Sequence, residues 1–228
     1  MYPKEIEKFL LGVQKPGRYT GGELNSIVKD KSKIDIRYAF CFPDTYEIGM
    51  SHLGMKILYS LVNARDDAWC ERVFAPDVDM EQVMRDNGIP LYALESGEAI
   101  KDFDLIGFTM QYELNMLDLA GLPVRSRDRK DLTPIVIAGG ACVCNAEPMA
   151  EFFDITLPGD GEEVTNELID LLKEFKAKGA TKQEFLEAAA QIKGVYVPSL
   201  YEVEYNDDCT VKSITPTHGA PEKVEKLN

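Results

Sequence analysis

Apolar residues along this chain gather into short runs typical of buried strands, and these runs alternate with stretches that repeat apolar residues at helical spacing. Strands are predicted over residues 34–42, 69–74, 104–109, 135–138 and 154–157, and helices over 3–11, 48–63, 77–86, 113–120 and 160–178. Strands that alternate with helices form a parallel sheet through right-handed crossovers. The pattern therefore predicts an α/β, Rossmann-like (flavodoxin-like) five-stranded parallel sheet flanked by helices, in the order 2-1-3-4-5.

The pattern changes after Gly179. Thr181 and Glu184 form a capping-box pattern that predicts a helix ending near Gly194, and a β-hairpin with its turn at Asn206–Asp208 follows. We expect an N-terminal arm (1–33), an α/β domain (34–179), a helix and β-hairpin appendix (180–214) and a polar, linker-like segment (215–228) that holds no core residue.

The composition narrows the range of partners. The chain has 228 residues and a net charge of −14, and such an acidic surface repels nucleic-acid backbones and anionic membranes. No apolar run has the length of a bilayer span, and the N-terminus is too charged for a secretory signal. Five scattered cysteines form no disulfide framework, which favours a cytoplasmic location.

Glycines follow the last two predicted strands. Gly139 and Gly140 end the fourth strand, and Gly159 and Gly161 follow the fifth. Loops at the carboxyl ends of parallel strands form the ligand crevice of such a sheet, and glycine lets the backbone approach a ligand closely. The sequence therefore predicts where a site lies, but not what it binds.

Motifs for catalysis and metal binding are weak. Cys142 and Cys144 have no third ligand nearby, and we interpret them as buried small residues after a strand. The histidines are His52 and His218, and the chain contains no GxSxG, no P-loop and no GxGxxG. We therefore predict no catalytic and no metal-ligating residue, and we place His52 at a helix start beside the crevice.

Acidic residues also gather at the predicted crevice. Asp44 and Glu47 flank the first loop, and Asp160, Glu162 and Glu163 begin the last helix of the sheet. Such carboxylates could bind a metal or transfer protons, but helix capping is the simpler explanation, with Asp160 as the cap.

Three segments together resemble a known family. FPDTYEIGMSHLGMKILYSLVN, DLIGFTMQYEL and AGGACVCNAEPMAEFFDITLPGDGEE resemble the cobalamin-binding-like domain that precedes radical S-adenosylmethionine (SAM) catalytic domains. KPGRYTGGE, ERVFAPDVDME and GVYVPSLYEV resemble one uncharacterised subfamily, so that the likeness covers residues 10–205. It implies a parent protein that continues into a radical SAM domain, whose CxxxCxxC motif holds the 4Fe-4S cluster and SAM. We expect this chain to be the N-terminal part of such a protein.

The resemblance also implies a cofactor site. Cobalamin would place its nucleotide tail between the sheet and the first and last helices, at Tyr46, Gly49, Met50, Thr109, Gln111, Gly139, Gly140, Gly159 and Gly161. The alternative is that the glycines only serve tight turns.

Two departures from the family pattern bear on this site. The DxHxxG motif that supplies a cobalt ligand is replaced by Asp44-Thr45-Tyr46-Glu47, and His52 comes too late, so histidine ligation is not expected. The segment from Gln111 to Leu117 is shorter than in relatives, which puts a complete pocket in doubt.

Two functions remain open. The first is a non-catalytic N-terminal domain that binds cobalamin, or positions substrate, over its own C-terminal radical SAM domain. The second is a degenerate domain without cofactor that acts as a docking or substrate-recognition module. A receiver-like module is disfavoured because the third strand ends Gly107-Phe108-Thr109 without an aspartate.

Overall fold

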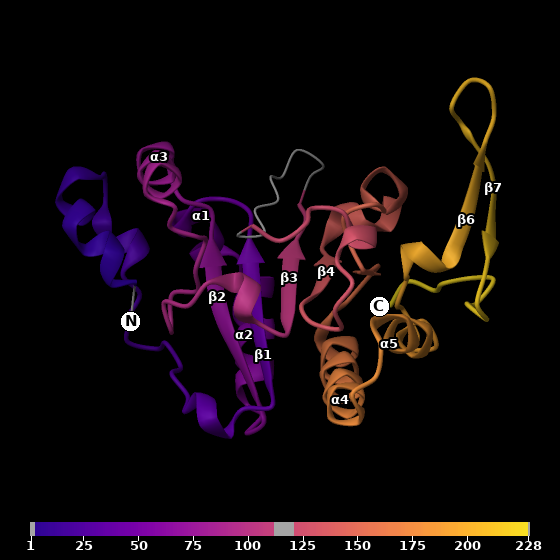
Figure 1. The fold of residues 1–228 in the computed structure, drawn as a ribbon, viewed down its shortest axis with the longest axis horizontal. Helices are drawn as coiled ribbons and strands as arrows, with labels where there is room; N and C mark the ends of the chain where they lie inside the picture. Colours follow the sequence, from indigo (N-terminus) through magenta and orange to yellow (C-terminus); the bar gives the residue numbers. More distant parts are fainter. Residues whose placement is uncertain (1–2, 112–120, 228) are drawn as a thin grey trace.

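A five-stranded parallel sheet forms the centre of the protein (Figure 1). The computed structural model describes residues 3–111 and 121–227. The strand order is β2-β1-β3-β4-β5, which confirms the predicted fold class and order. The strands are β1 (Ile36–Phe42), β2 (Ala68–Phe74), β3 (Leu105–Thr109), β4 (Ile135–Gly139) and β5 (Ile155–Leu157). Because all neighbouring pairs run parallel, the carboxyl ends of the strands meet at one edge.

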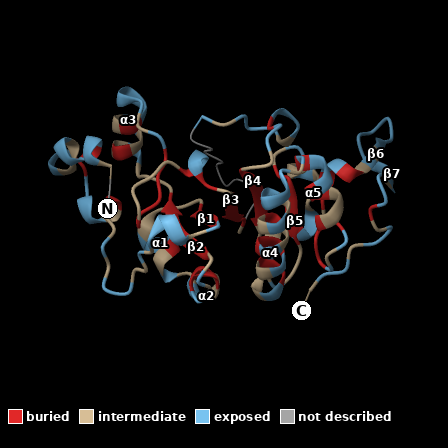
Figure 2. Ribbon diagram, turned by 60° about the horizontal axis from the view of Figure 1, so that its bottom comes forward, coloured by how far each residue is buried: buried red, intermediate tan, exposed pale blue. Residues whose placement is uncertain are grey.

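The α-helices of the described residues are α1 (Tyr46–Ser51), α2 (Leu53–Asn63), α3 (Val78–Asn87), α4 (Glu162–Lys178) and α5 (Lys182–Ala189). The helices α2 and α4 contact each other and both contact β1. Figure 2 shows the buried residues gathered between these helices and the strands. Within the two described ranges, no helix combines the length and the apolar character needed to cross a membrane.

Short 3-10 helices make up much of the remaining chain. They lie at Lys4–Gly12, Pro16–Tyr19, Lys31–Lys33, Ile100–Asp102, Ser126–Asp128, Ala141–Asn145, Glu147–Met149 and Pro198–Leu200. The helix predicted over 3–11 is therefore a 3-10 helix at Lys4–Gly12. The helix predicted over 113–120 and the shortened segment after Gln111 lie outside the described residues, apart from Gln111 itself.

The single helix predicted over 48–63 is wrong, because the chain breaks at His52. His52 is extended (φ −77°, ψ 118°), and its Nδ1 accepts a hydrogen bond of 3.2 Å from the N–H of Met55. The imidazole thus caps α2. Apolar periodicity did not reveal the break because the apolar residues continue at helical spacing across it.

The start of α4 also differs from the prediction. Gly161 is the N-terminal cap residue and no side chain caps the helix, so Asp160 is not the cap. Asp160 instead donates its backbone N–H to the carbonyl of Leu227 at 3.3 Å. The prediction missed this contact because it joins residues far apart in the sequence.

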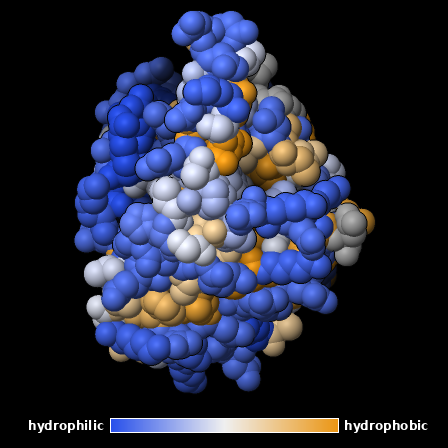
Figure 3. Space-filling view, turned by 90° about the vertical axis from the view of Figure 1, so that its right-hand side faces the viewer, coloured by the Kyte–Doolittle hydropathy of each residue, from blue (hydrophilic) through white to orange (hydrophobic). Residues whose placement is uncertain are grey.

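The C-terminal part confirms the predicted hairpin and corrects the segment after it. The strands β6 (Tyr201–Tyr205) and β7 (Val211–Pro216) pair antiparallel, and the capping box at Thr181 is present. Figure 3 shows this end of the molecule as largely hydrophilic, with narrow apolar bands. Residues 215–228 were expected to hold no core residue. Ala220 is nevertheless buried, and Leu227 packs on the core and pairs in parallel with Gly159.

Asp154 fixes how β5 lies against β4. Its carboxylate is fully buried and pairs with Lys182 at 2.7 Å and Arg129 at 3.2 Å. One carboxylate oxygen accepts the N–H of Val136 at 2.8 Å, and the N–H of Asp154 donates to the carbonyl of Val136 at 2.9 Å. A buried charge needs such partners because it has left water. The acid therefore holds the two strands in one register.

We predict that Asp154→Asn lowers the free energy of unfolding by about 3 kcal/mol, because it leaves two buried cations without their counter-charge. Urea unfolding followed by circular dichroism measures the change. The matched control is Asp170→Asn, which removes a carboxylate from a pair with Arg65 whose acid is exposed, and which we expect to cost less than about 1 kcal/mol. Equal losses in both variants would contradict the role given to Asp154.

Candidate functional site

A cleft opens at the carboxyl edge of the sheet, beneath the N-terminal ends of α2 and α4. Its volume is about 170 Å³. It is lined by Tyr38, Phe40, His52, Gly54, Leu58, Gly107, Phe108, Thr109, Gln111, Ile137, Gly139, Gly140, Leu157, Gly159, Asp160, Gly161, Glu162 and Thr165. Pockets that enclose a whole small molecule usually measure about 300–1,000 Å³. The cleft therefore has room for part of a ligand.

The structure brings six of the nine predicted cofactor-binding residues together in this cleft, namely Thr109, Gln111, Gly139, Gly140, Gly159 and Gly161. They come from β3, β4 and the loops after β3, β4 and β5. This arrangement follows from the parallel strand order, and ligand binding by these residues remains a prediction.

The other three predicted residues lie away from the cleft. The hydroxyl of Tyr46 donates to Glu23 at 2.7 Å. A Cβ at Gly49 would overlap the ring of Phe74. Met50 lines a different cavity, of about 460 Å³, between the N-terminal arm and α2. These three positions therefore hold the N-terminal arm and β2 in place.

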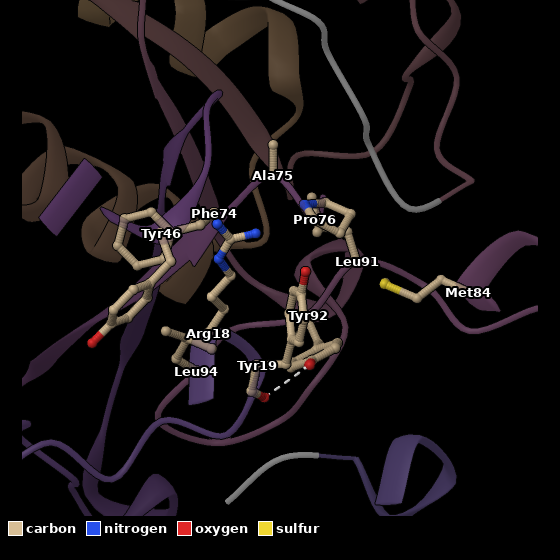
Figure 4. A pocket seen from close by; sticks show the side chains of 10 residues that line it. All are labelled: Arg18, Tyr19, Tyr46, Phe74, Ala75, Pro76, Met84, Leu91, Tyr92 and Leu94. Carbon is tan, nitrogen blue, oxygen red and sulfur yellow. Dashed lines mark hydrogen bonds between the residues drawn. The ribbon is translucent and has the colours of Figure 1, made fainter. Parts of the chain in front are cut away.

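Tyr46 lines the pocket of Figure 4, where the side chain of Arg18 points toward Phe74. Arg18 pairs with Asp77 and, at 2.9 Å, with Glu47. The volume of this pocket is about 20 Å³, which is close to the size of one water molecule. The residues around this pocket therefore hold the N-terminal arm in place, and the pocket itself is too small to admit a ligand.

His52 lies at the cleft with one ring nitrogen already in use. Its Nδ1 accepts the N–H of Met55, and its ring centre lies 5.1 Å from that of Phe42. A neutral imidazole whose Nδ1 accepts a hydrogen bond carries its proton on Nε2. While His52 caps α2, it therefore offers the cleft an N–H donor and no free nitrogen for a metal.

The cysteines after β4 differ from the prediction. Cys142 is partly exposed and Cys144 is exposed, because Ala141–Asn145 forms a 3-10 helix on the surface instead of continuing the buried strand. Among the residues that the structure describes, no three histidine, cysteine or acidic side chains form a group able to hold a metal.

Tyr38 and Gly107 are among the cleft residues that were not predicted. Tyr38 lies in the middle of β1 and Gly107 in the middle of β3, and both line the cleft. A glycine inside a strand often marks a close approach of another group, so DLIGFT carried a usable signal for Gly107. Nothing in the sequence distinguishes Tyr38 from an ordinary core tyrosine.

Comparison with known proteins finds a matching family and a related protein. The family described as the N-terminal region of radical SAM proteins matches residues 54–198. An uncharacterized protein of Methanocaldococcus jannaschii, MJ0966, is 27% identical over 170 residues, which is 73% of this chain and 33% of that protein. The chain thus spans about a third of the length of this curated relative. No solved structure matches.

The carboxylate of Glu47, which pairs with residues of the N-terminal arm, should titrate at unusually low pH. Hydrogen bonds from Lys15 and Arg18 lower the pKa of Glu47 from 4.5 to about 2. Because the folded-state pKa is lowered, the contact is fully present above pH 4.5 and is lost as the pH falls through about 2. A carboxyl-carbon NMR titration of Glu47 should show this midpoint, and the double variant Lys15→Ala/Arg18→Gln should move it toward 4.5. An unchanged midpoint in that variant would contradict the assignment.

Adjacent glycines of the cleft should differ in their tolerance of a side chain. A Cβ at Gly140 would lie 2.6 Å from the carbonyl oxygen of Met110, and its φ is +101°. We expect Gly140→Ala to lower the free energy of unfolding by about 1–3 kcal/mol. A Cβ at Gly139 meets nothing within 4 Å, so Gly139→Ala should change it by less than about 0.5 kcal/mol. Thermal or urea unfolding of both variants checks this, and a costly Gly139→Ala would contradict the geometry.

Proposed function

Because this chain belongs to the family of N-terminal domains of radical SAM proteins, we propose that it is a non-catalytic domain that binds cobalamin, or positions substrate, over a radical SAM catalytic domain. That catalytic domain would be its partner and would hold the 4Fe-4S cluster and SAM. The five cysteines form no disulfide in the part of the chain that the structure describes, which supports a cytoplasmic location for the protein.

The residues of the cleft suit one part of cobalamin. A cavity of about 170 Å³ is too small for the corrin ring but has room for a planar end group such as the base of the nucleotide tail. Thr109, Gly139 and Gly140 would line the entry of the tail, and the corrin would lie outside the mouth. When bound, cobalamin supplies a cobalt centre, while this chain binds and orients it.

The observation that carries the proposal is the open rim at Gly139 beside the side chain of Thr109. Thr109 is 8% exposed and lines the cleft, and no hydrogen bond to its side chain is found among the described residues. A Cβ at Gly139 would meet nothing within 4 Å. Open space beside a polar side chain is typical of small-molecule sites, in which a few polar groups orient the ligand.

A second candidate is a degenerate domain that docks its partner or recognises substrate without a cofactor. Two observations favour it. The cleft is small, and Leu227 occupies the rim by pairing with Gly159. A Cβ at Gly159 would overlap the carbonyl of Leu227, so this glycine already serves the chain itself.

Binding of hydroxocobalamin separates the two candidates. After incubation with hydroxocobalamin and gel filtration, we expect the protein to retain the red chromophore. Gly139→Val should weaken binding at least about tenfold because its side chain fills the open rim. The control is Gly12→Val, at an exposed glycine of the N-terminal arm that likewise has nothing within 4 Å of its Cβ position. Colourless wild-type protein would reject cobalamin binding and favour the docking module.

A further inference from the structure

The hydroxyl group of Tyr38 lies at the inner end of the cleft. Tyr38 is 4% exposed and lines the cleft, and its ring stacks on that of Phe40 with 5.6 Å between ring centres. Nothing in residues 3–111 and 121–227 hydrogen-bonds to its Oη. The Oη is not among the described buried side-chain atoms that lack a partner, which agrees with a hydroxyl that faces the open cleft, where an entering group can pair with it.

The neighbouring strand makes room for this hydroxyl. Gly107 of β3 lies opposite Phe40 of β1, and a Cβ at Gly107 would overlap the Oη of Tyr38. Gly107 has no unusual φ, so it is not required for a turn. Its missing side chain leaves the space above the sheet in which the hydroxyl lies. Tyr38 and Gly107 therefore form one unit that sets the depth of the cleft.

The polar groups of the cleft define the chemistry of what enters. Burial raises the pKa of Tyr38 well above its usual value, so the hydroxyl keeps its proton and acts as a donor. His52 also offers a donor, because its Nδ1 is taken by Met55. Carboxylates of Asp160 and Glu162 line the same cleft and disfavour an anion. The entering group is therefore an uncharged hydrogen-bond acceptor.

The walls of the cleft define the shape of that group. Apolar residues from the sheet and from α2 also line the cleft, including Phe40, Leu58 and Ile137. The space lies between a sheet face and packed helices, and its volume is about 170 Å³. A flat aromatic ring suits a cleft lined in this way, because it places a large apolar area against the lining side chains and keeps a polar edge for a hydrogen bond.

We propose that the hydroxyl of Tyr38 donates a hydrogen bond to a ring nitrogen of a planar, uncharged heteroaromatic group at the inner end of the cleft, and that Gly107 sets how deep this group enters. The inference rests on the proposed function. It identifies Tyr38 as the residue that recognises the part of the ligand at the inner end of the cleft. For cobalamin, this end would be the benzimidazole of the nucleotide tail, whose ring nitrogen would accept the hydrogen bond in the form in which it is not bound to cobalt.

The test compares the affinity of the protein for hydroxocobalamin with its affinity for dicyanocobinamide, which lacks the nucleotide tail. Both affinities are measured by titration followed by visible absorption spectroscopy. We expect wild-type protein to bind hydroxocobalamin at least about tenfold more tightly. Tyr38→Phe should remove most of this preference without weakening cobinamide binding. Gly107→Ala should act in the same direction by closing the inner end. The control Tyr205→Phe, at an exposed tyrosine of β6, should change neither affinity.

A second readout separates binding from folding. Because no described residue hydrogen-bonds to the Oη of Tyr38, Tyr38→Phe should leave the midpoint of thermal unfolding unchanged or raise it. A hydroxyl with a structural role would instead lower the midpoint on removal. A clear loss of stability in ligand-free Tyr38→Phe would therefore overturn the inference.

The outcomes also distinguish this inference from the proposed function. If wild-type protein binds both corrinoids equally and Tyr38→Phe changes nothing, cobalamin binding stands and the role of Tyr38 is rejected. If neither corrinoid binds, free 5,6-dimethylbenzimidazole is titrated while the amide signals of Gly107 and Thr109 are followed by NMR. Saturable shifts that disappear in Tyr38→Phe uphold the inference and reject cobalamin, whereas no shifts reject both.

Discussion

The buried carboxylate of Asp154 is the interaction on which the site depends. By hydrogen-bonding to Val136 through both its side chain and its backbone, it fixes the register between β4 and β5. That register places Gly139 opposite Leu157, and the loop at Gly159 then follows beside the cleft. A slip of one residue would reverse the faces of β5 and move its loop away. The shape of the cleft therefore derives from a charge buried at the opposite end of the strands.

A similar use of buried charge holds the other side of the sheet. Arg37 on β1 pairs with Glu71, and Arg72 on β2 pairs with Glu95 at 2.6 Å. Burial raises the pKa of both glutamates, although the arginines oppose this effect. Such pairs add little net stability compared with apolar residues, but they penalise alternative arrangements that leave a charge unpaired. Arg72 also pairs with Glu23 at 2.8 Å, so these pairs fix β2 relative to β1 and hold the N-terminal arm against β2.

The sequence was sufficient for features that depend on local pattern. Alternating strands and helices gave the strand order, and Thr181 with Glu184 marked a helix start that the structure contains. Parallel strand ends also placed Gly139 and Thr109 at one edge. Features that depend on contacts between distant residues were missed. The pairing of Leu227 and the fit of Tyr38 over Gly107 leave no periodic signal, because each depends on what lies opposite in space. The break at His52 is a local feature, since His52 caps Met55 three residues later, but the apolar pattern continues across it.

The pairing between Leu227 and Gly159 connects the segment after the β-hairpin to the loop after β5. The carbonyl of Leu227 accepts from Asp160, and its N–H donates to Pro158, so both hydrogen bonds end on the loop after β5. Because that loop borders the cleft, tension along residues 221–227 would pull directly on its mouth. The width of the entrance is therefore tied to the position of a segment that follows the hairpin, and displacing this segment would reshape the opening without moving the sheet.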